Sequence, residues 1–415
     1  MFGWPRSIPD YKWPDRHRAA WLFLRRAAIA LLFHLARIAG RVASAIGANP
    51  PAVLVVRTDG IGDAVLFEPA LRSLADRFSC QQLHLWAPAA TCDLFAEHPA
   101  VAQRLVIPRG GKAGNLEYFE SARWRAVMGW RLGRFAFQLA AYTVDSPEPL
   151  GDWILSSVRA RERWYAPGDT ENQFDWQRDR TSRSVTKLLP SRPAGGHELL
   201  RNAHLAGQWG GSANSLPIVA LGAQEHWRAE QEVRTWRKLA SVVGAGRIVG
   251  TMSGSAAPMN AYPAASWATV IRLLWTRHRA LCALFGGPAD SPRIMEISRL
   301  VPDVPHVQPP LTIGLRTTAA LLQTIEGFIS IDTGLAHVAV ALNVPTVVLR
   351  HGGHPGRFFP WPAANSNVVI SHPMPCEGCR CRCVLAEPEC ITRIRPEEVV
   401  AAYAELLRSG KRAAA

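Results

Sequence analysis

Two short loops, one in each half of the chain, constrain the fold most. Residues 58–63 read TDGIGD and directly follow an apolar run at 53–56, while residues 332–337 read DTGLAH and directly follow an apolar run at 328–331. Each pattern predicts a buried strand, a tight glycine-containing turn and the start of a helix. The first N–H groups of a helix are unpaired and the helix dipole is positive there, so such turns bind phosphate. The pair predicts two α/β domains that face each other across a cleft.

Strands and helices are expected to alternate along most of the chain. Residues 281–285 form an apolar run without polar alternation, which is typical of a buried parallel strand. Such alternation predicts parallel sheets covered by helices on both faces, and 415 residues are enough for two domains of this kind. The expected parts are a basic amphipathic leader at 1–50, an N-terminal α/β domain at 51–240, a C-terminal α/β domain at 241–395 that includes the cysteine-rich segment, and a closing helix and tail at 396–415.

The charge of the chain favours a negatively charged partner. The formal net charge is +14 and the pI is near 10.0. Nucleic acid, an anionic membrane surface and a phosphorylated substrate are all negatively charged partners of this kind. The sequence has no helix-turn-helix pattern, no zinc-finger spacing and no RNA-binding aromatic signature, so we expect no nucleic-acid partner. No strand is followed by G-x-G-x-x-G, which argues against a dinucleotide-binding dehydrogenase.

The leader contains an apolar segment that basic residues interrupt. Arg25, Arg26, His34 and Arg37 lie within it, which argues against a helix that spans a membrane. No small-residue cleavage site follows a short apolar core, so the segment is a poor secretory signal. Residues 19–46 suit either a helix on an anionic membrane surface or an ordinary helix packed on the first domain. We therefore expect a cytoplasmic protein, with peripheral contact to the inner membrane face as one alternative.

Five of the eight cysteines lie between residues 376 and 390. Without a signal peptide a disulfide framework is not expected, and the spacing C-x2-C-x-C-x-C-x6-C offers thiolates at intervals typical of metal ligands. Thiolates favour zinc or iron. The prediction is a structural metal, with free thiols or disulfides as the alternatives, on four ligands: Cys376, Cys379, Cys383 and Cys390. Cys381 would be left over.

Several stretches resemble the glycosyltransferases of the lipopolysaccharide heptosyltransferase type, glycosyltransferase family 9. They occur in the family's order at 53–78, 197–207, 254–267, 285–290 and 329–361. The last is the most specific, because DTGLAH is followed by ALNVPTV and PGRFFPW. The resemblance implies a GT-B fold, with two Rossmann-like domains and an active site between them. It also implies an enzyme that moves a sugar, classically from ADP-heptose, to a glycan such as the lipopolysaccharide core with inversion, and that needs no cofactor for this chemistry.

The resemblance assigns the catalytic base to Asp63. Inverting transfer needs a group that takes the proton from the acceptor hydroxyl, and a carboxylate at the edge of a cleft suits that role. By its pattern alone Asp63 would rather be an N-cap of the following helix. Asp59 is the reserve candidate for the base. The acceptor side is expected to include four residues: Asp59, Gly60, Gly62 and Asp145.

The second loop is expected to bind the diphosphate of the donor. Glycine there lets the backbone approach closely, and the threonine hydroxyl can donate. The residues concerned are Asp332, Thr333, Gly334, Leu335, Ala336 and His337. Two other loops at predicted strand ends are expected to contact phosphate or ribose, through Ser253, Gly254 and Ser255 and through Gly286, Gly287 and Asp290. The simpler alternatives are plain structural turns and, for His337, a buried core histidine.

The sequence departs from the family at Asn260. Family members usually carry Lys or Arg at this place to neutralise the diphosphate, so the charge must come from elsewhere, with Arg350 and Arg357 as candidates, or the donor differs. Two alternatives to the proposed transfer therefore stay open. One is a glycosyltransferase that modifies autotransporter-type proteins and carries a cysteine-bound metal, as some family members do. The other is a non-catalytic relative that kept nucleotide binding.

Overall fold

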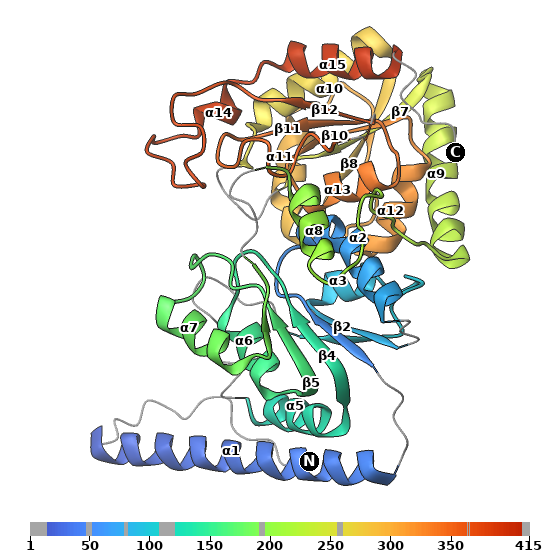
Figure 1. The fold of residues 1–415 in the computed structure, drawn as a ribbon. Helices are drawn as coiled ribbons and strands as arrows, with labels where there is room; N and C mark the ends of the chain where they lie inside the picture. The colour runs from blue at the N-terminus through green and yellow to red at the C-terminus, as the bar shows by residue number, and fades with distance from the viewer. Residues whose placement is uncertain are drawn as a thin grey trace. The chain divides into compact units, whose positions relative to one another are not determined.

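The computed structural model describes residues 15–46, 52–78, 82–107, 121–190, 196–254, 260–362, 364 and 366–408. The chain divides into two compact units, shown as a ribbon in Figure 1. Unit 1 comprises residues 1–56 and 110–188, and unit 2 comprises residues 57–109 and 189–415. Residues 57–109 thus group with the C-terminal half of the chain. The expected domain boundaries at 50, 240 and 395 stay predictions.

Unit 1 combines a long N-terminal helix with part of the first sheet. Its helices are α1 (Asp15–Ile46), α5 (Ala122–Arg134), α6 (Pro149–Ser157) and α7 (Asp175–Ser184). Its strands are β1 (Val53–Val56), β4 (Ala136–Tyr142), β5 (Arg159–Tyr165) and β6 (Lys187–Leu188). β1 pairs with β4, β4 with β5 and β5 with β6, all in parallel.

Unit 2 contains the second sheet and most of the helices. Its strands are β2 (Leu83–Ala87), β3 (Gln103–Val106), β7 (Arg247–Met252), β8 (Ala280–Phe285), β9 (His306–Val307), β10 (Gly327–Ile331), β11 (Thr346–Leu349) and β12 (Asn367–Ile370). Its longer helices are α2 (Ile61–Arg77), α8 (Glu198–Gly207), α9 (Ala223–Val243), α10 (Ala264–His278), α11 (Ser291–Leu300), α12 (Leu315–Gln323), α13 (Gly334–Ala341) and α15 (Pro396–Arg408). The short ones are α3 (Ala89–Leu94), a 3-10 turn at Pro288–Asp290 and α14 (Glu389–Thr392).

Both sheets have six strands and reverse their order part-way. The orders are β3-β2-β1-β4-β5-β6 and β12-β11-β10-β7-β8-β9. Within the second sheet neighbouring strands are parallel, so that Ile329 of β10 lies opposite Val347 of β11 on one side and Thr251 of β7 on the other. Parallel strands joined by helices confirm the predicted α/β class. The carboxyl ends of β7, β8 and β10 therefore meet at one edge.

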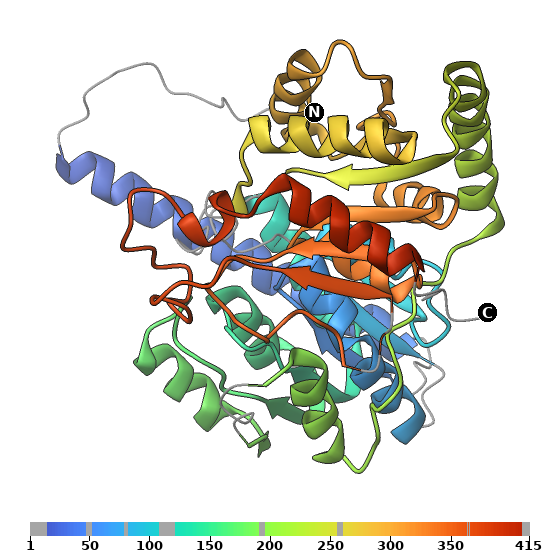
Figure 2. The same ribbon diagram turned by 90° about the horizontal axis from the view of Figure 1, so that it is seen from above.

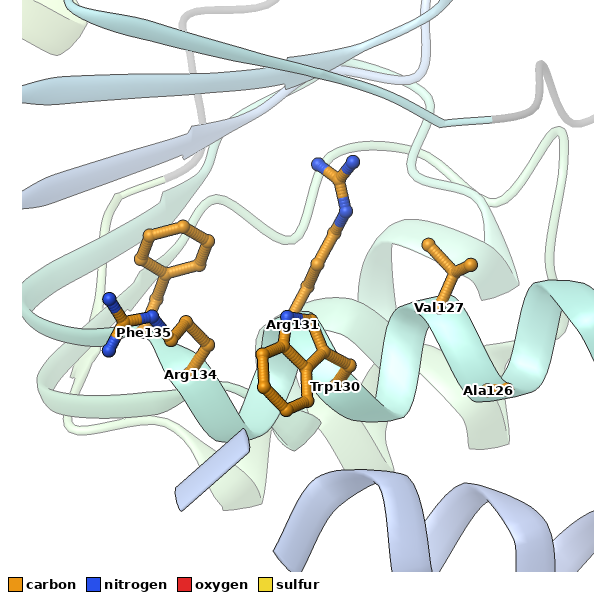
Figure 3. Close-up of a pocket in the computed structure, with 6 residues that line it drawn as sticks. All are labelled: Ala126, Val127, Trp130, Arg131, Arg134 and Phe135. Atoms are coloured by element: carbon orange, nitrogen blue, oxygen red, sulfur yellow. The ribbon is translucent and has the colours of Figure 1, made fainter. Parts of the chain in front are cut away.

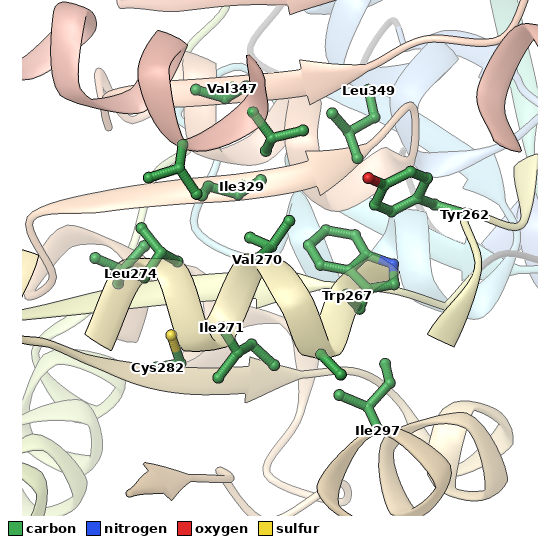
Figure 4. Close-up of a cluster of buried hydrophobic side chains, with 14 of the residues drawn as sticks. Tyr262, Trp267, Val270, Ile271, Leu274, Cys282, Ile297, Ile329, Val347 and Leu349 are labelled. Carbon is green, nitrogen blue, oxygen red and sulfur yellow. The ribbon is translucent and has the colours of Figure 1, made fainter. Parts of the chain in front are cut away.

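The core of unit 2 lies between the second sheet and a layer of helices. Trp267, Val270 and Leu274 of α10 pack toward Ile329 and Val347 of β10 and β11 (Figure 4). α15 lies beside α10 on the same face of the sheet (Figures 1 and 2). Trp267 and Ile329 are completely buried. Burial of such side chains contributes about 1.5–3 kcal/mol each, which holds the strand ends, and hence the loops that follow them, in place.

Candidate functional site

The two loops that the sequence singled out touch each other within unit 2. A Cβ atom on Gly62 would lie 2.7 Å from Cδ2 of His337, and one on Gly334 would lie 2.9 Å from Cβ of Ile61. No real Cβ atom approaches so closely, so both positions require glycine for a steric reason. The starts of α2 and α13 are thereby brought together, and each start offers unpaired backbone N–H groups.

Asp63 lies in the first turn of α2 and is not its N-cap. The N-cap is Gly60, whose carbonyl accepts the N–H of Ala64 at 3.0 Å. This corrects the simpler reading of Asp63 as a capping residue. Among the described residues, no hydrogen bond or ion pair occupies the carboxylate of Asp63. A carboxylate that is unused structurally is available for chemistry.

The surroundings of Asp63 favour its protonated form. Burial, together with the negative charges of Asp59 and Glu198, raises the pKa of Asp63 to about 7 against the opposing effect of Arg357 and Arg57. Near neutral pH the group can therefore both accept and release a proton. Perturbed carboxyl groups of this kind are typical of general acid–base catalysts.

Asp59 is held in an ion pair. Arg57 Nε donates to Asp59 Oδ1 at 3.0 Å, and a second, shorter contact joins the Nη2 and Oδ2 atoms of the same two side chains. The guanidinium group of Arg57 is buried and lies over the ring of Phe67 at 4.2 Å. A carboxylate paired on both oxygens is less free to take a proton, so Asp63 remains the better candidate for the base.

Glu198, at the start of α8, is a site residue that the sequence reasoning missed. It is buried and accepts hydrogen bonds on Oε2 from Arg357 Nε at 3.2 Å and from Arg201 Nη1 at 3.3 Å. Its backbone N–H donates to Arg357 O at 2.7 Å. The loop at 351–361 is thereby fastened to α8 beside Asp63. The sequence signal was available, since the HELLR stretch belongs to the resemblance.

The loop at 332–337, here called the predicted donor loop, carries a second carboxyl group with a raised pKa. Burial raises the pKa of Asp332 to about 7, and Arg350 opposes this. The side-chain amide of Asn260 donates to the backbone carbonyl of Asp332 at 3.2 Å. The Ser330 and Thr333 hydroxyl oxygens are 3.3 Å apart. Asn260 therefore supports this loop, although it carries no charge.

His337 is neutral and its ring is fixed on both sides. Burial lowers the pKa of His337 to about 3, with a further contribution from His197. Trp361 Nε1 donates to His337 Nδ1 at 3.1 Å, and the ring of Phe359 stacks on the imidazole at 4.2 Å. Because Nδ1 accepts, the proton lies on Nε2, which is 3.8 Å from Asp332 Oδ1. The predicted donor loop thus includes a side-chain N–H donor.

The remaining predicted donor residues gather around Asp290. Gly287 N donates to Asp290 Oδ2 at 2.8 Å, and a Cβ atom on Gly254 would lie 2.0 Å from Asp290 Oδ1. The loops after β7 and β8 therefore meet at this carboxylate, at the edge where α/β sheets bind ligands. Ser253 is buried there, whereas Ser255 lies outside the described residues.

Both candidate sources of positive charge near the donor loop are already paired. Arg350 Nη2 donates to Glu377 Oε1 at 2.9 Å and to Ser371 Oγ at 3.1 Å. Arg357 is held by Glu198 as described above. The missing Lys or Arg at 260 is therefore not replaced by an unpaired arginine at 350 or 357.

The cysteine cluster lies close to the loop at 351–361. Burial raises the pKa of the Cys390 thiol, and the neighbouring Cys383, Cys376 and Cys379 raise it further. Cys381 Sγ instead lies 4.0 Å from His351 Nδ1. Across the described ranges, no three His, Cys, Asp or Glu side chains are arranged to hold a metal ion. The predicted metal is thus not supported by the thiol positions, although the four predicted ligands do affect one another.

Asp145 belongs to unit 1, whereas the other described residues predicted for the site belong to unit 2. It follows β4, and its carbonyl accepts the N–H of Asp169 at 2.8 Å. Unit 1 also has a hollow of about 680 Å³ on α5 (Figure 3), which contains no predicted site residue. The hollow is lined by Ala126, Val127, Trp130, Arg131, Arg134 and Phe135. The acceptor-binding role of Asp145 stays a prediction.

A sequence model of the family described as glycosyltransferase family 9 (heptosyltransferase) matches residues 179–386. The chain belongs to glycosyltransferase family 9. It is therefore a glycosyltransferase, and the resemblance inferred from its motifs is confirmed. The same match includes α8, the donor loop and most of the cysteine cluster.

Similar proteins agree with this assignment. The chain is 22% identical over 362 residues to lipopolysaccharide heptosyltransferase 1 of Pseudomonas aeruginosa, with 84% of this chain and 95% of that protein covered. The glycosyltransferase family 9 structure from Veillonella parvula matches with a TM-score of 0.69 at 16% identity, covering 88% and 99% of the two chains. Escherichia coli heptosyltransferase WaaC, solved with ADP-2-deoxy-2-fluoro heptose, matches with a TM-score of 0.58 at 16% identity, covering 86% and 99%. The structural likeness confirms the predicted GT-B fold.

Proposed function

We propose that this enzyme transfers heptose or a related sugar from a nucleotide-sugar donor to a cell-surface glycan such as the lipopolysaccharide core, with inversion at the anomeric carbon. The observation that carries the proposal is Asp63, a carboxyl group without a hydrogen-bond partner among the described residues, whose pKa is raised to about 7 and which lies beside two helix starts in contact. Family membership supplies the reaction class. The donor, the acceptor and the stereochemistry are our inference.

In the proposed step, Asp63 takes the proton of the acceptor hydroxyl while the hydroxyl oxygen attacks the anomeric carbon. The bond from that carbon to the diphosphate breaks, and the nucleoside diphosphate leaves with the electron pair. A base whose pKa is near the working pH is the most effective for such a transfer. The charges of Glu198 and Asp59 support this role because they strengthen proton uptake by Asp63.

The diphosphate is proposed to lie on the start of α13, held by backbone N–H groups, the Thr333 hydroxyl and Nε2–H of His337. Asp332 fits this arrangement because its raised pKa allows a neutral carboxyl group beside the phosphates. Asp290, Gly286 and Gly287 are proposed to hold the ribose. ADP-heptose is the favoured donor, since WaaC is solved with an ADP-heptose analogue.

The acceptor is proposed to contact Asp59, Gly60, Gly62 and Asp145. A lipopolysaccharide core is favoured by the name of the Pseudomonas aeruginosa relative. Another lipid-linked glycan or an autotransporter-type protein remains an alternative acceptor. A cytoplasmic location, peripheral on the inner membrane face, belongs to the same proposal.

A zinc or iron ion on Cys376, Cys379, Cys383 and Cys390 is proposed as a structural element without a part in the transfer step. Its support is the ligand-like spacing and the influence of the other three thiols on Cys390. Because the thiols as placed do not form a ligand set, the ion would have to draw them together. Metal analysis of the purified protein tests this, with Cys390→Ser expected to lose the ion and Cys381→Ser expected to keep it.

The experiment that tests the function is calorimetric titration with ADP, GDP, UDP and dTDP, followed by a transfer assay with the nucleotide-sugar of the base that binds. We expect saturable ADP binding that Thr333→Val weakens. Binding without any transfer or donor hydrolysis would instead support the non-catalytic relative, which Asn260 favours. Failure of folded protein to bind any of the four would contradict the proposal.

A further inference from the structure

The helix α1 is fixed against α5 by backbone contacts at glycines. Three glycines leave no room for a Cβ atom. On α1, a Cβ atom at Gly40 would lie 2.3 Å from Trp130 O. On α5, a Cβ atom would lie 2.4 Å from Phe33 O at Gly129 and 2.1 Å from Arg37 O at Gly133. Glycines spaced four apart on α5 let two helices approach this closely, as in other helix pairs joined by small residues. α1 therefore cannot turn about its axis without a clash.

This fixed rotation decides which side chains α1 buries. Ile29 and Phe33 are buried toward α5, and the guanidinium group of Arg125 lies over the Phe33 ring at 4.6 Å. Arg134 Nη1 donates to Ala43 O at 2.6 Å. α1 is thus an ordinary packed helix on one side, which agrees with one of the two alternatives expected for the leader.

The opposite side of α1 carries a row of exposed apolar residues, here called the outer stripe. Its members, with their exposed fractions, are Leu24 (65%), Leu31 (60%), Leu35 (55%), Ile38 (56%) and Val42 (57%). At helical periodicity they fall within about 60° of arc, away from Ile29 and Phe33. α1 runs along α5 in unit 1 (Figure 1), and among the described elements α5 is its main neighbour, on the side away from the stripe.

The charge around the outer stripe identifies its partner. Residues 16–46 contain six arginines and no acidic residue. The exposed Arg25 and Arg41 flank the stripe on opposite sides at helical spacing. A second copy of this helix would bring guanidinium groups together, whereas anionic headgroups would neutralise them. The long arginine side chains can reach the headgroup phosphates from a helix immersed in the interface.

The helix is suited to lie on a bilayer and not to cross it. Within the described residues, no helix combines the length and the apolar character needed to span a membrane. An apolar row flanked by arginines is the pattern of a helix that lies in the plane of the interface. We propose that α1 docks unit 1 on an anionic phospholipid surface, with the outer stripe among the acyl chains and Arg25 and Arg41 at the phosphates. This inference is independent of the sugar transferred.

The test is co-sedimentation of the full-length protein with vesicles of phosphatidylcholine mixed with phosphatidylglycerol, and with phosphatidylcholine alone. We expect binding to the anionic vesicles that falls roughly tenfold or more in the neutral ones or at high salt. Leu31→Glu/Leu35→Glu should also lose roughly tenfold or more, because two carboxylates replace side chains that enter the apolar layer. The matched control is Trp227→Glu on α9, a change at an apolar residue that is 64% exposed, which should bind as the unaltered protein does.

Nucleotide binding of each variant, measured by calorimetry, keeps this result separate from the proposed function. Leu31→Glu/Leu35→Glu should keep the nucleotide affinity of the unaltered protein, which also shows that it is folded. Equal binding to both kinds of vesicle, no vesicle binding, or unchanged binding of the double variant would overturn the proposal. A dimer of the unaltered protein that light scattering detects and that is absent in the double variant would also overturn the proposal, since a second copy would then cover the outer stripe.

Discussion

The indole N–H of Trp361 donates to Nδ1 of His337 across 3.1 Å. Because an indole N–H can only donate, this contact places the proton of the neutral imidazole on Nε2, the nitrogen beside Asp332. Both rings are buried, and Phe359 stacks on His337. Trp361 lies outside the loop at 332–337, and it thus affects the proposed donor site by fixing the tautomer of His337.

Replacing the indole of Trp361 should remove the hydrogen bond that fixes the tautomer of His337. For Trp361→Phe we expect ADP affinity to fall roughly three- to tenfold, since one hydrogen bond contributes about 0.5–1.5 kcal/mol. The imidazole ¹⁵N shifts of His337 should change from the Nε2–H form to a mixture, a signature that a merely structural loss of packing would not produce. Unchanged shifts together with unchanged affinity would contradict the assignment.

Replacing the proposed base should affect the chemical step and spare the donor. For Asp63→Asn we expect kcat to fall about 10²–10⁴-fold, the usual contribution of a positioned general base. ADP should bind equally well or more tightly, because a negative charge near the diphosphate is removed. Single-turnover assays and calorimetry on the same preparation separate the two quantities. A variant with the kcat of the unaltered enzyme would exclude Asp63 as the base.

The two carboxyl groups with raised pKa values should make the fold less stable at high pH. Asp63 and Asp332 have their pKa values raised from 3.8 to about 7 in the fold. Stability that comes from the protonated forms is complete below about pH 4 and is lost as the pH rises through 7. With allowance for partial exposure, the loss is about 1–2 kcal/mol for each group.

The double variant Asp63→Asn/Asp332→Asn should therefore melt roughly 2–6 °C higher than the unaltered protein at about pH 8.5, and near the same temperature at about pH 4.5. Asp303→Asn is the control of opposite sign, since Arg272 lowers the pKa of that exposed carboxyl group. Thermal melts followed by circular dichroism measure the difference. The same shift in melting temperature at both pH values would show that the raised pKa values are not its cause.

The contact between the two helix starts should not tolerate a methyl group. For Gly334→Ala the new Cβ would lie 2.9 Å from Cβ of Ile61 and 3.3 Å from the backbone N of Gly62, so the loop itself must move. We expect ADP affinity to fall roughly tenfold or more, as measured by calorimetry. Gly207→Ala is the matched control, because nothing lies within 4 Å of its added atom. Equal affinities of the two variants would mean that the close approach has no part in binding.

Much of the fold could be predicted from apolar runs and glycine turns. The apolar runs at 53–56, 281–285 and 328–331 lie in β1, β8 and β10, since their patterns are local. β4, β5 and the helices between 121 and 190 were obscured by surface Trp and Arg, which weaken the periodic signal.

The sequence by itself determined the two strand–turn–helix loops, the α/β class, the family and the candidates Asp63 and Asp332, because each depends on residue types at short spacing. Tertiary structure alone decided the rest. It brought Gly62 against His337, placed Glu198 and Arg357 beside Asp63, and turned the outer stripe of α1 away from α5. Proton affinity and surface exposure depend on burial and on charges from distant parts of the chain, and no local pattern encodes these.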